Sequence, residues 1–125
     1  MELLAIDHVV LTVASVERTA AFYRDVLGMR AEVSDAGRWS LHFGSQKINL
    51  HEAGHEFEPK AARPTPGSAD LCLVARTTID EVVAALRASG VAIVEGPVER
   101  LGALGRMRSV YVRDPDHNLI EISNY

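Results

Sequence analysis

The sequence is poor in cysteine and in basic residues, and it has no long apolar run. Cys72 is the single cysteine among 125 residues, so no disulfide can form within the chain, which suits the reducing cytoplasm. Lys and Arg number 13 against 17 for Asp and Glu, a net charge of −4 without the basic stripe that nucleic acid needs. The apolar runs are shorter than the roughly 20 residues of a membrane span. We therefore expect a cytoplasmic protein that binds neither nucleic acid nor membrane, and the first residues show no signal-peptide pattern.

The composition that remains is ordinary for a globular protein, with 47% hydrophobic and 24% charged residues. A chain of 125 residues fits one domain and buries about two-thirds of the surface that it exposes when unfolded. We therefore expect residues 1–125 to fold as a single domain without disulfide support.

The first half of the chain predicts a strand, a helix and three more strands. Apolar residues alternate along residues 5–13, which is typical of a strand with one buried face. Ser15 is placed to cap the start of a helix, and Gly28 is placed to end it. Three further strands are expected over residues 29–35, 39–43 and 47–51, with a turn at Gly44-Ser45.

The second half repeats this order. A strand over residues 69–75 precedes a helix that Thr78 caps and Gly90 ends. A short strand over 91–94, a glycine-rich loop over 96–105, and a hairpin of residues 109–112 and 118–123 are expected to follow. Between the halves, residues 53–67 are rich in Gly, Pro, His and charge, which predicts a long loop, either a lid over a site or a solvated connector.

This repetition predicts an α+β fold of two tandem βαβββ modules. The first module covers about residues 1–53, the second about 68–125, and a linker loop at about 54–67 joins them. Two copies with this long a period indicate duplication rather than a solenoid array.

Polar residues gather on one side of the predicted strands. The more aliphatic side of each strand is expected to cover the helix, which leaves His8 and Asn49 on the other side of the first half. Asp70 and Glu121 take the matching positions in the second half, and His51 shares the side of Asn49. Converging imidazole and carboxylate groups are what a divalent ion requires. The pattern therefore indicates a metal site or another polar binding site, although a lone His or Glu in a strand is more often structural or solvated.

Other residues on this side are candidates for substrate contacts. Tyr111, matched in the first half by His42, is a hydrogen-bond donor to a substrate oxygen or an ordinary wall residue. Arg106 and Arg113 are candidates for binding an anionic substrate, with an ion pair to Asp114 as the alternative for Arg113.

Three segments carry a resemblance to a known family. They are Ile6-Asp7-His8-Val9, Ala21-Phe22-Tyr23-Arg24-Asp25-Val26-Leu27-Gly28-Met29, and Val112-Arg113-Asp114-Pro115-Asp116-His117-Asn118-Leu119-Ile120-Glu121. In this order and spacing they resemble the vicinal oxygen chelate superfamily, which includes glyoxalase I, fosfomycin-modifying enzymes, extradiol dioxygenases and bleomycin-binding proteins. The resemblance covers essentially the whole chain. It implies two βαβββ modules whose mixed sheets curl into a cup, with helices outside and a metal inside, often at a homodimer interface.

The resemblance also implies a ligand set. The family's metal positions fall on His8, Asn49, Asp70 and Glu121, although Asp70 stands where His is usual and Asn49 stands where glyoxalase I has Glu. The resemblance implies a divalent ion such as Zn, Ni, Mn or Fe. One His with two carboxylates is a harder site than two His with one, which favours Mn, Mg or Fe(II) over a tight Zn site. His51 is the alternative ligand. The loss of Glu at position 49 also removes a general base, so glyoxalase I activity itself is not expected.

These features lead to competing functions. The first is a divalent-metal-dependent enzyme acting on a small polar substrate, with Tyr111, Asn49 and Arg113 as catalytic candidates. The second is a metal-free binding or resistance protein of the bleomycin-binding type, which the residues at positions 49 and 70 favour. A fosfomycin-type adduct enzyme is a third. A homodimer is expected because open sheet edges can be covered by a partner.

Overall fold

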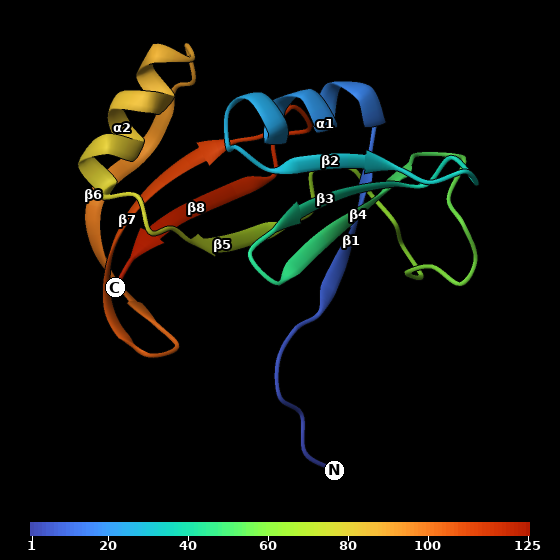
Figure 1. The fold of residues 1–125 in the computed structure, drawn as a ribbon, viewed down its shortest axis with the longest axis horizontal. Coiled ribbons are helices and arrows are strands. Elements are labelled where there is room, and N and C mark those ends of the chain that lie inside the picture. The colour runs from blue at the N-terminus through green and yellow to red at the C-terminus, as the bar shows by residue number, and fades with distance from the viewer. The chain divides into compact units, whose positions relative to one another are not determined.

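The computed structural model describes all 125 residues, and the chain divides into two compact units, Met1–Pro66 and Gly67–Tyr125. In chain order the elements are β1 (His8–Val13), α1 (Val16–Asp25), β2 (Arg30–Val33), β3 (Trp39–Phe43), β4 (Gln46–Glu52), β5 (Asp70–Val74), α2 (Ile79–Ala88), β6 (Ile93–Gly102), β7 (Gly105–Arg113) and β8 (Leu119–Asn124) (Figure 1). The predicted α+β class, with βαβββ order in each half, is confirmed. No helix or strand lies between β4 and β5, as expected for the connecting loop.

Each unit contains one mixed four-stranded sheet with the same connectivity. The strand order is β1-β4-β3-β2 in the first unit and β5-β8-β7-β6 in the second. In both units the first strand pairs in parallel with the last, and the remaining pairs are antiparallel. A parallel pair needs a crossover connection, and in each unit the helix and two middle strands supply it.

Helix α1 forms where the sequence supplies both ends. The hydroxyl of Ser15 accepts a hydrogen bond of 3.2 Å from the Arg18 amide, which satisfies one of the free N–H groups of the first turn. The chain leaves the helix through Gly28, whose φ of +72° lies in the region that glycine tolerates best. The helix packs on β2, β3 and β4 through a buried side that includes Ala20 and Tyr23.

The apolar side of each sheet faces its helix, as the alternation predicted. In the first unit the fully buried strand residues include Val13, Leu41 and Ile48, and in the second they include Val110 and Ile120. Burial of each such side chain contributes roughly 1.5–3 kcal/mol. Because side chains alternate between the two sides of a strand, the opposite side of the sheets carries His8, Asn49, Asp70 and Glu121, none of them fully buried.

The glycine-rich loop predicted over residues 96–105 is wrong. Strand β6 runs through most of this segment as far as Gly102, and only a tight turn separates it from β7. The pairing register shifts between Ile93 and Glu95 and again between Glu95 and Val98, so the strand carries a bulge at Gly96. A Cβ atom on Gly96 would lie 2.5 Å from the carbonyl oxygen of Ser109. Glycine here permits close approach of two strands instead of marking a loop.

Both helices are ten residues long, and neither has the length and hydropathy that crossing a membrane requires.

Candidate functional site

The polar side of the first unit is organised by strand register. Val10 pairs with Asn49, which in turn pairs with Ser40, so these three form one row across β1, β4 and β3. The neighbouring row runs from His8 through Lys47 and His42 to Arg30. Polar and cationic side chains therefore occupy two adjacent rows of this sheet.

His8 lies at the start of β1, with 44% of its side chain exposed. Its Nδ1 atom is 2.7 Å from a carboxylate oxygen of Asp7. The hydrogen bond and charge of His8 hold the pKa of Asp7 below its usual range. A carboxylate on Nδ1 leaves Nε2 as the ring atom for a further ligand, the arrangement usual for metal-binding histidines.

His51 lies far from His8 on the same side of the sheet. The register pairs His8 with Lys47 and Thr12 with His51, so the two histidines are offset by four residues along the strands, or about 13 Å. The imidazole of His51 instead packs edge-on against Phe57, with 5.6 Å between ring centroids. The structure therefore does not bring the two histidines together.

Asn49 and His51 line a pocket of about 240 Å³ that lies entirely within the first unit. Phe57, from the connecting loop, contributes to its wall together with Trp39. The remaining lining residues are Ser34, Arg38, Ser40, Lys47 and Leu50. The pocket thus combines aromatic surface with a few polar groups, which is the usual character of a small-molecule site.

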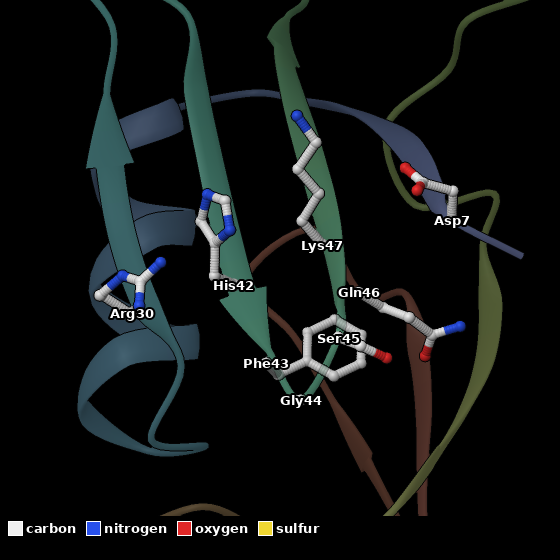
Figure 2. A pocket seen from close by; sticks show the side chains of 8 residues that line it. All are labelled: Asp7, Arg30, His42, Phe43, Gly44, Ser45, Gln46 and Lys47. Carbon is white, nitrogen blue, oxygen red and sulfur yellow. The ribbon is translucent and has the colours of Figure 1, made fainter.

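A second, more open pocket of about 460 Å³ lies beside the β3–β4 turn. Figure 2 shows Arg30, His42 and Lys47 on strands β2, β3 and β4, standing on the same side of the sheet, with Asp7 at the far edge. The carboxylate of Glu32 already contacts both Arg30, at 2.8 Å, and His42, at 3.2 Å. Glu32 therefore neutralises much of the charge of Arg30 and His42 in this pocket, while Lys47 forms no ion pair.

In the second unit, Glu121 is the centre of the polar row. It pairs with Cys72 on one side and with Tyr111 on the other. The hydroxyl of Ser123 donates a hydrogen bond of 3.3 Å to Oε1 of Glu121, and it lies 2.7 Å from the buried Ser109 hydroxyl. The Ser123 hydroxyl, two residues along the same side of β8, thus orients the carboxylate of Glu121.

Asp70 lies diagonally from Glu121, two residues before its direct neighbour Cys72. Side chains at diagonal positions of neighbouring strands are within reach when they are long enough. Loss of hydration raises the pKa of the Cys72 thiol, and the charges of Glu121 and Asp70 act in the same direction. The cysteine is therefore a protonated thiol at neutral pH and a weak nucleophile.

Arg100 is a site residue that sequence reasoning missed. Its Nε atom donates a hydrogen bond of 3.0 Å to the phenol oxygen of Tyr111, and its other branch binds Glu95 at 2.9 Å. Loss of hydration raises the pKa of Tyr111, the Arg100 bond opposes this rise, and Glu121 adds to it. No signal in the sequence placed Arg100 here, because the segment was interpreted as a loop.

The remaining candidates lie at the ends of β7. Arg113 donates a hydrogen bond of 3.1 Å to the backbone carbonyl of His117 in the following turn. Arg106 forms an ion pair of 2.8 Å with Glu99, and both are well exposed. The predicted match of Tyr111 with His42 is wrong: Tyr111 pairs with Glu121 as Ser40 pairs with Asn49, so Ser40 is the counterpart.

No three side chains of His, Cys, Asp or Glu gather into a metal-binding group in the structure. Asp70 and Glu121 are predicted ligands that lie at diagonal positions on neighbouring strands of the second unit. Their oxygen atoms fit a hard divalent ion as part of a ligand set.

Comparisons with known proteins agree with this geometry. The profile of the Glyoxalase/Bleomycin resistance protein/Dioxygenase superfamily matches residues 5–122. The chain is 58% identical to the virulence protein STM3117 of Salmonella typhimurium over 120 residues, which is 96% of this chain and 83% of that protein. The crystal structure of the Salmonella protein superimposes with a TM-score of 0.98, covering 100% of this chain and 99% of that one.

Two further relatives are more distant. The glyoxalase domain-containing protein RDO1 of Mycosarcoma maydis is 51% identical over 97% of this chain and 68% of its own length. The structure of a lactoylglutathione lyase from Agrobacterium tumefaciens is 25% identical, with a TM-score of 0.73 over 96% of this chain and 92% of that one. By its sequence and by its paired βαβββ modules, the chain belongs to the glyoxalase, bleomycin resistance and dioxygenase superfamily.

Proposed function

We propose that this protein is a divalent-metal-dependent enzyme that acts on a small polar substrate, by a lyase, isomerase, dioxygenase or transferase reaction. One observation carries the proposal: Glu121 lies directly opposite Tyr111 and diagonally from Asp70 on the polar side of one sheet. Two carboxylates and a phenol in this arrangement offer oxygen ligands next to a proton donor. Family membership and the likeness to a lactoylglutathione lyase support an enzymatic role.

The proposed metal ligands are Glu121 and Asp70, on neighbouring strands of the second unit, and His8, on β1 of the first unit. A ligand set rich in carboxylate favours Mn, Mg or Fe(II) over a tight Zn site. When bound, such an ion would supply Lewis acidity to two neighbouring oxygens of the substrate.

The protein's own groups would position and protonate the substrate. Ser123 holds the Glu121 carboxylate in a fixed orientation through its hydrogen bond. Arg100 holds the Tyr111 phenol, and the raised pKa keeps that phenol protonated at neutral pH, ready to donate to a substrate oxygen. Asn49 offers an amide, and Arg113 offers the N–H groups that His117 does not use.

Metal analysis of protein purified without chelator tests the proposal. We expect a stoichiometric divalent ion in the native protein and at least a ten-fold loss in the variants Glu121→Ala and His8→Ala, because each removes one ligand. Glu99→Gln, which removes an exposed carboxylate paired with Arg106, is the matched control and should retain the metal. Undiminished metal in both ligand variants would exclude the proposed site.

A metal-free binding protein is the second candidate. The pocket of about 240 Å³ favours it, because aromatic walls from Trp39 and Phe57 suit an organic molecule and need no ion. A thermal-shift screen separates the two functions. Stabilisation by small organic compounds but by no divalent ion would support the second function over the first.

We also propose that the protein is a cytoplasmic homodimer. Each sheet ends in strands that lack a neighbour within their own unit, β1 and β2 in one and β5 and β6 in the other. Such edges are commonly covered by a partner. Light scattering across micromolar concentrations should give the dimer mass, and a monomer throughout would contradict the assembly.

A further inference from the structure

The pocket of about 240 Å³ in the first unit is lined by two permanent cations and by no carboxylate. Its cations are Arg38 and Lys47, and no Asp or Glu is among its lining residues. Clefts with one sign of charge and low-dielectric walls concentrate ions of the opposite sign. The positive charge of this pocket therefore favours binding of an anion.

Lys47 lies in the middle of the sheet, flanked by His8 and His42 on the neighbouring strands. Its half-buried stem packs on the polar side, and its ammonium forms no ion pair in the structure. The pKa of Asp7 is lowered mainly by its hydrogen bond to His8, and Lys47 is the least of the causes. The positive charge of Lys47 thus remains largely uncompensated.

Arg38 is held by stacking and not by a carboxylate. Its guanidinium carbon lies 4.4 Å from the centroid of the Phe57 ring, whose edge is in turn packed against His51. Stacking fixes the plane of a guanidinium and leaves its in-plane N–H groups available for a ligand. Other cations of the chain, such as Arg24 and Arg106, are instead paired with acidic neighbours.

The rest of the lining fits an organic acid better than an inorganic ion. The amide of Asn49 and the hydroxyls of Ser34 and Ser40 provide hydrogen-bonding groups, while Trp39 and Phe57 provide apolar surface. Lys47 also lines the larger pocket beside the β3–β4 turn, but that pocket contains the carboxylate of Asp7, and its Arg30 is paired with Glu32.

We infer that this pocket binds the anionic group of a small organic acid, with Lys47 and Arg38 as its cationic contacts and Phe57 against its apolar body. The inference rests on the proposed function in that the acid is taken as the small polar substrate. It does not depend on the metal, because every residue that carries it lies in the first unit.

Calorimetric titration in low-salt buffer with chelator tests the inference, with benzoate and phenylphosphonate as probes and neutral benzamide as their isostere. We expect both anions to bind and benzamide to bind at least ten-fold more weakly, because hydrogen bonds assisted by charge are stronger than those between neutral groups. The ratio of the two anions distinguishes a carboxylate site from a phosphonate site.

Variants then assign the binding to this pocket. Lys47→Met and Arg38→Met should each weaken benzoate binding about ten-fold or more, while Lys47→Arg should stay within about three-fold of the native protein. Arg24→Gln removes the same charge from α1 and should change nothing. Circular dichroism and the Tm of each variant confirm folding.

Two results would overturn the inference: benzamide binding as well as benzoate, or both methionine variants binding the anions like the native protein. Failure of both anions to bind at millimolar concentration would also overturn it. If metal analysis finds no ion in the native protein and benzoate still binds in the presence of chelator, the anion site is supported and the metal-dependent enzyme is contradicted. If the native protein holds a stoichiometric ion but binds neither anion, the metal site is supported and the anion site is contradicted.

Discussion

Glu121 on β8 and Tyr111 on β7 are direct cross-strand partners. The Tyr111 phenol oxygen also accepts a hydrogen bond of 3.0 Å from Nε of Arg100. The phenol therefore lies between a carboxylate that disfavours its ionisation and a guanidinium that favours it. Loss of hydration adds to the effect of the carboxylate, and the net result is a raised pKa.

This arrangement predicts opposite pKa changes in two variants. Arg100→Met removes a donor that stabilises the phenolate, so the pKa of Tyr111 should rise further. Glu121→Gln removes a negative charge that destabilises the phenolate, so the pKa should fall. Titration of ¹³Cζ-labelled tyrosine resolves Tyr111 from Tyr23 and Tyr125, and a shift of the same sign in both variants would contradict the arrangement.

The hydroxyl of Thr19 is buried in α1 without a hydrogen-bond partner. Thr19→Val replaces the hydroxyl with a methyl group of similar size, which removes this desolvation penalty. We expect a gain of about 1 kcal/mol in the free energy of unfolding, measured in urea. Thr19→Ala should instead lose about 1 kcal/mol through the cavity that it leaves, and a destabilised valine variant would refute the assignment.

Gly96 should tolerate substitution less well than a glycine at positive φ with open space around it. Its φ is +106°, and a Cβ atom would meet the Ser109 carbonyl oxygen at 2.5 Å. Gly96→Ala should lower the free energy of unfolding by about 3 kcal/mol or more, since strand separation adds to backbone strain. Gly37→Ala, at φ +75° with open space around it, should lose only about 1–2 kcal/mol. Equal losses in chemical denaturation would argue against the close strand contact.

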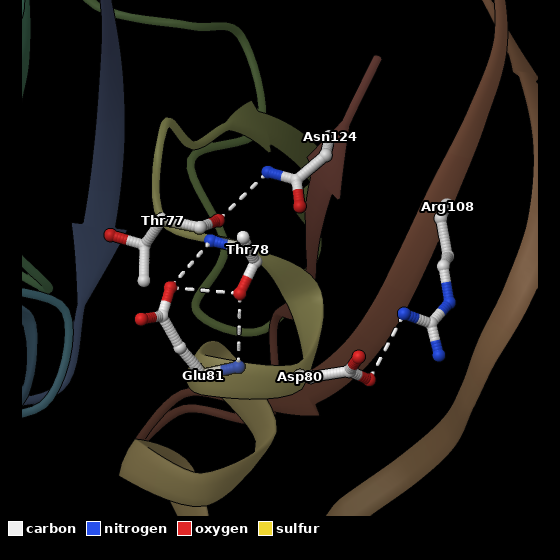
Figure 3. A network of polar contacts seen from close by, with 6 residues as sticks. All are labelled: Thr77, Thr78, Asp80, Glu81, Arg108 and Asn124. Carbon is white, nitrogen blue, oxygen red and sulfur yellow. Dashed lines mark hydrogen bonds and ion pairs between the residues drawn. The ribbon is translucent and has the colours of Figure 1, made fainter.

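Thr78 and Glu81 form a reciprocal cap at the start of α2. Figure 3 shows the Thr78 hydroxyl accepting from the Glu81 amide while the Glu81 carboxylate accepts from the Thr78 amide. Thr78→Ala should lower the free energy of unfolding by about 1 kcal/mol. Thr77→Ala, one residue earlier, should change it by no more than about 0.5 kcal/mol. Thermal or urea unfolding of the two variants checks the difference.

Most of the fold was accessible from the sequence, because its signals are local. Strand alternation predicted which side of β1, β4, β5 and β8 is buried, and Ser15 and Thr78 predicted both helix starts. The failure at β6 has a physical cause. Gly96 interrupts the alternation as a loop residue would, and only the Ser109 backbone on the facing strand explains why glycine is required.

The candidate site was accessible only in part. Parity placed His8, Asn49 and Glu121 on the polar side, since side-chain direction follows directly from strand period. The alternation of side chains does not reveal how neighbouring strands are aligned, because that register depends on long-range pairing. The sequence therefore matched Tyr111 with His42 instead of Ser40. Arg38 and Arg100 were missed for the same reason: their roles depend on Phe57 and Tyr111, which are distant in sequence.

The most direct test of the central claim is an NMR titration of the chelator-treated protein with Mn²⁺. We expect paramagnetic broadening, at substoichiometric Mn²⁺, of the side-chain signals of Glu121 and Asp70, which lie on neighbouring strands of the second unit. The matched variant Glu121→Gln should abolish the broadening at Asp70. Broadening confined to exposed carboxylates such as Glu99, or none at equimolar Mn²⁺, would contradict a metal site built on Glu121 and Asp70.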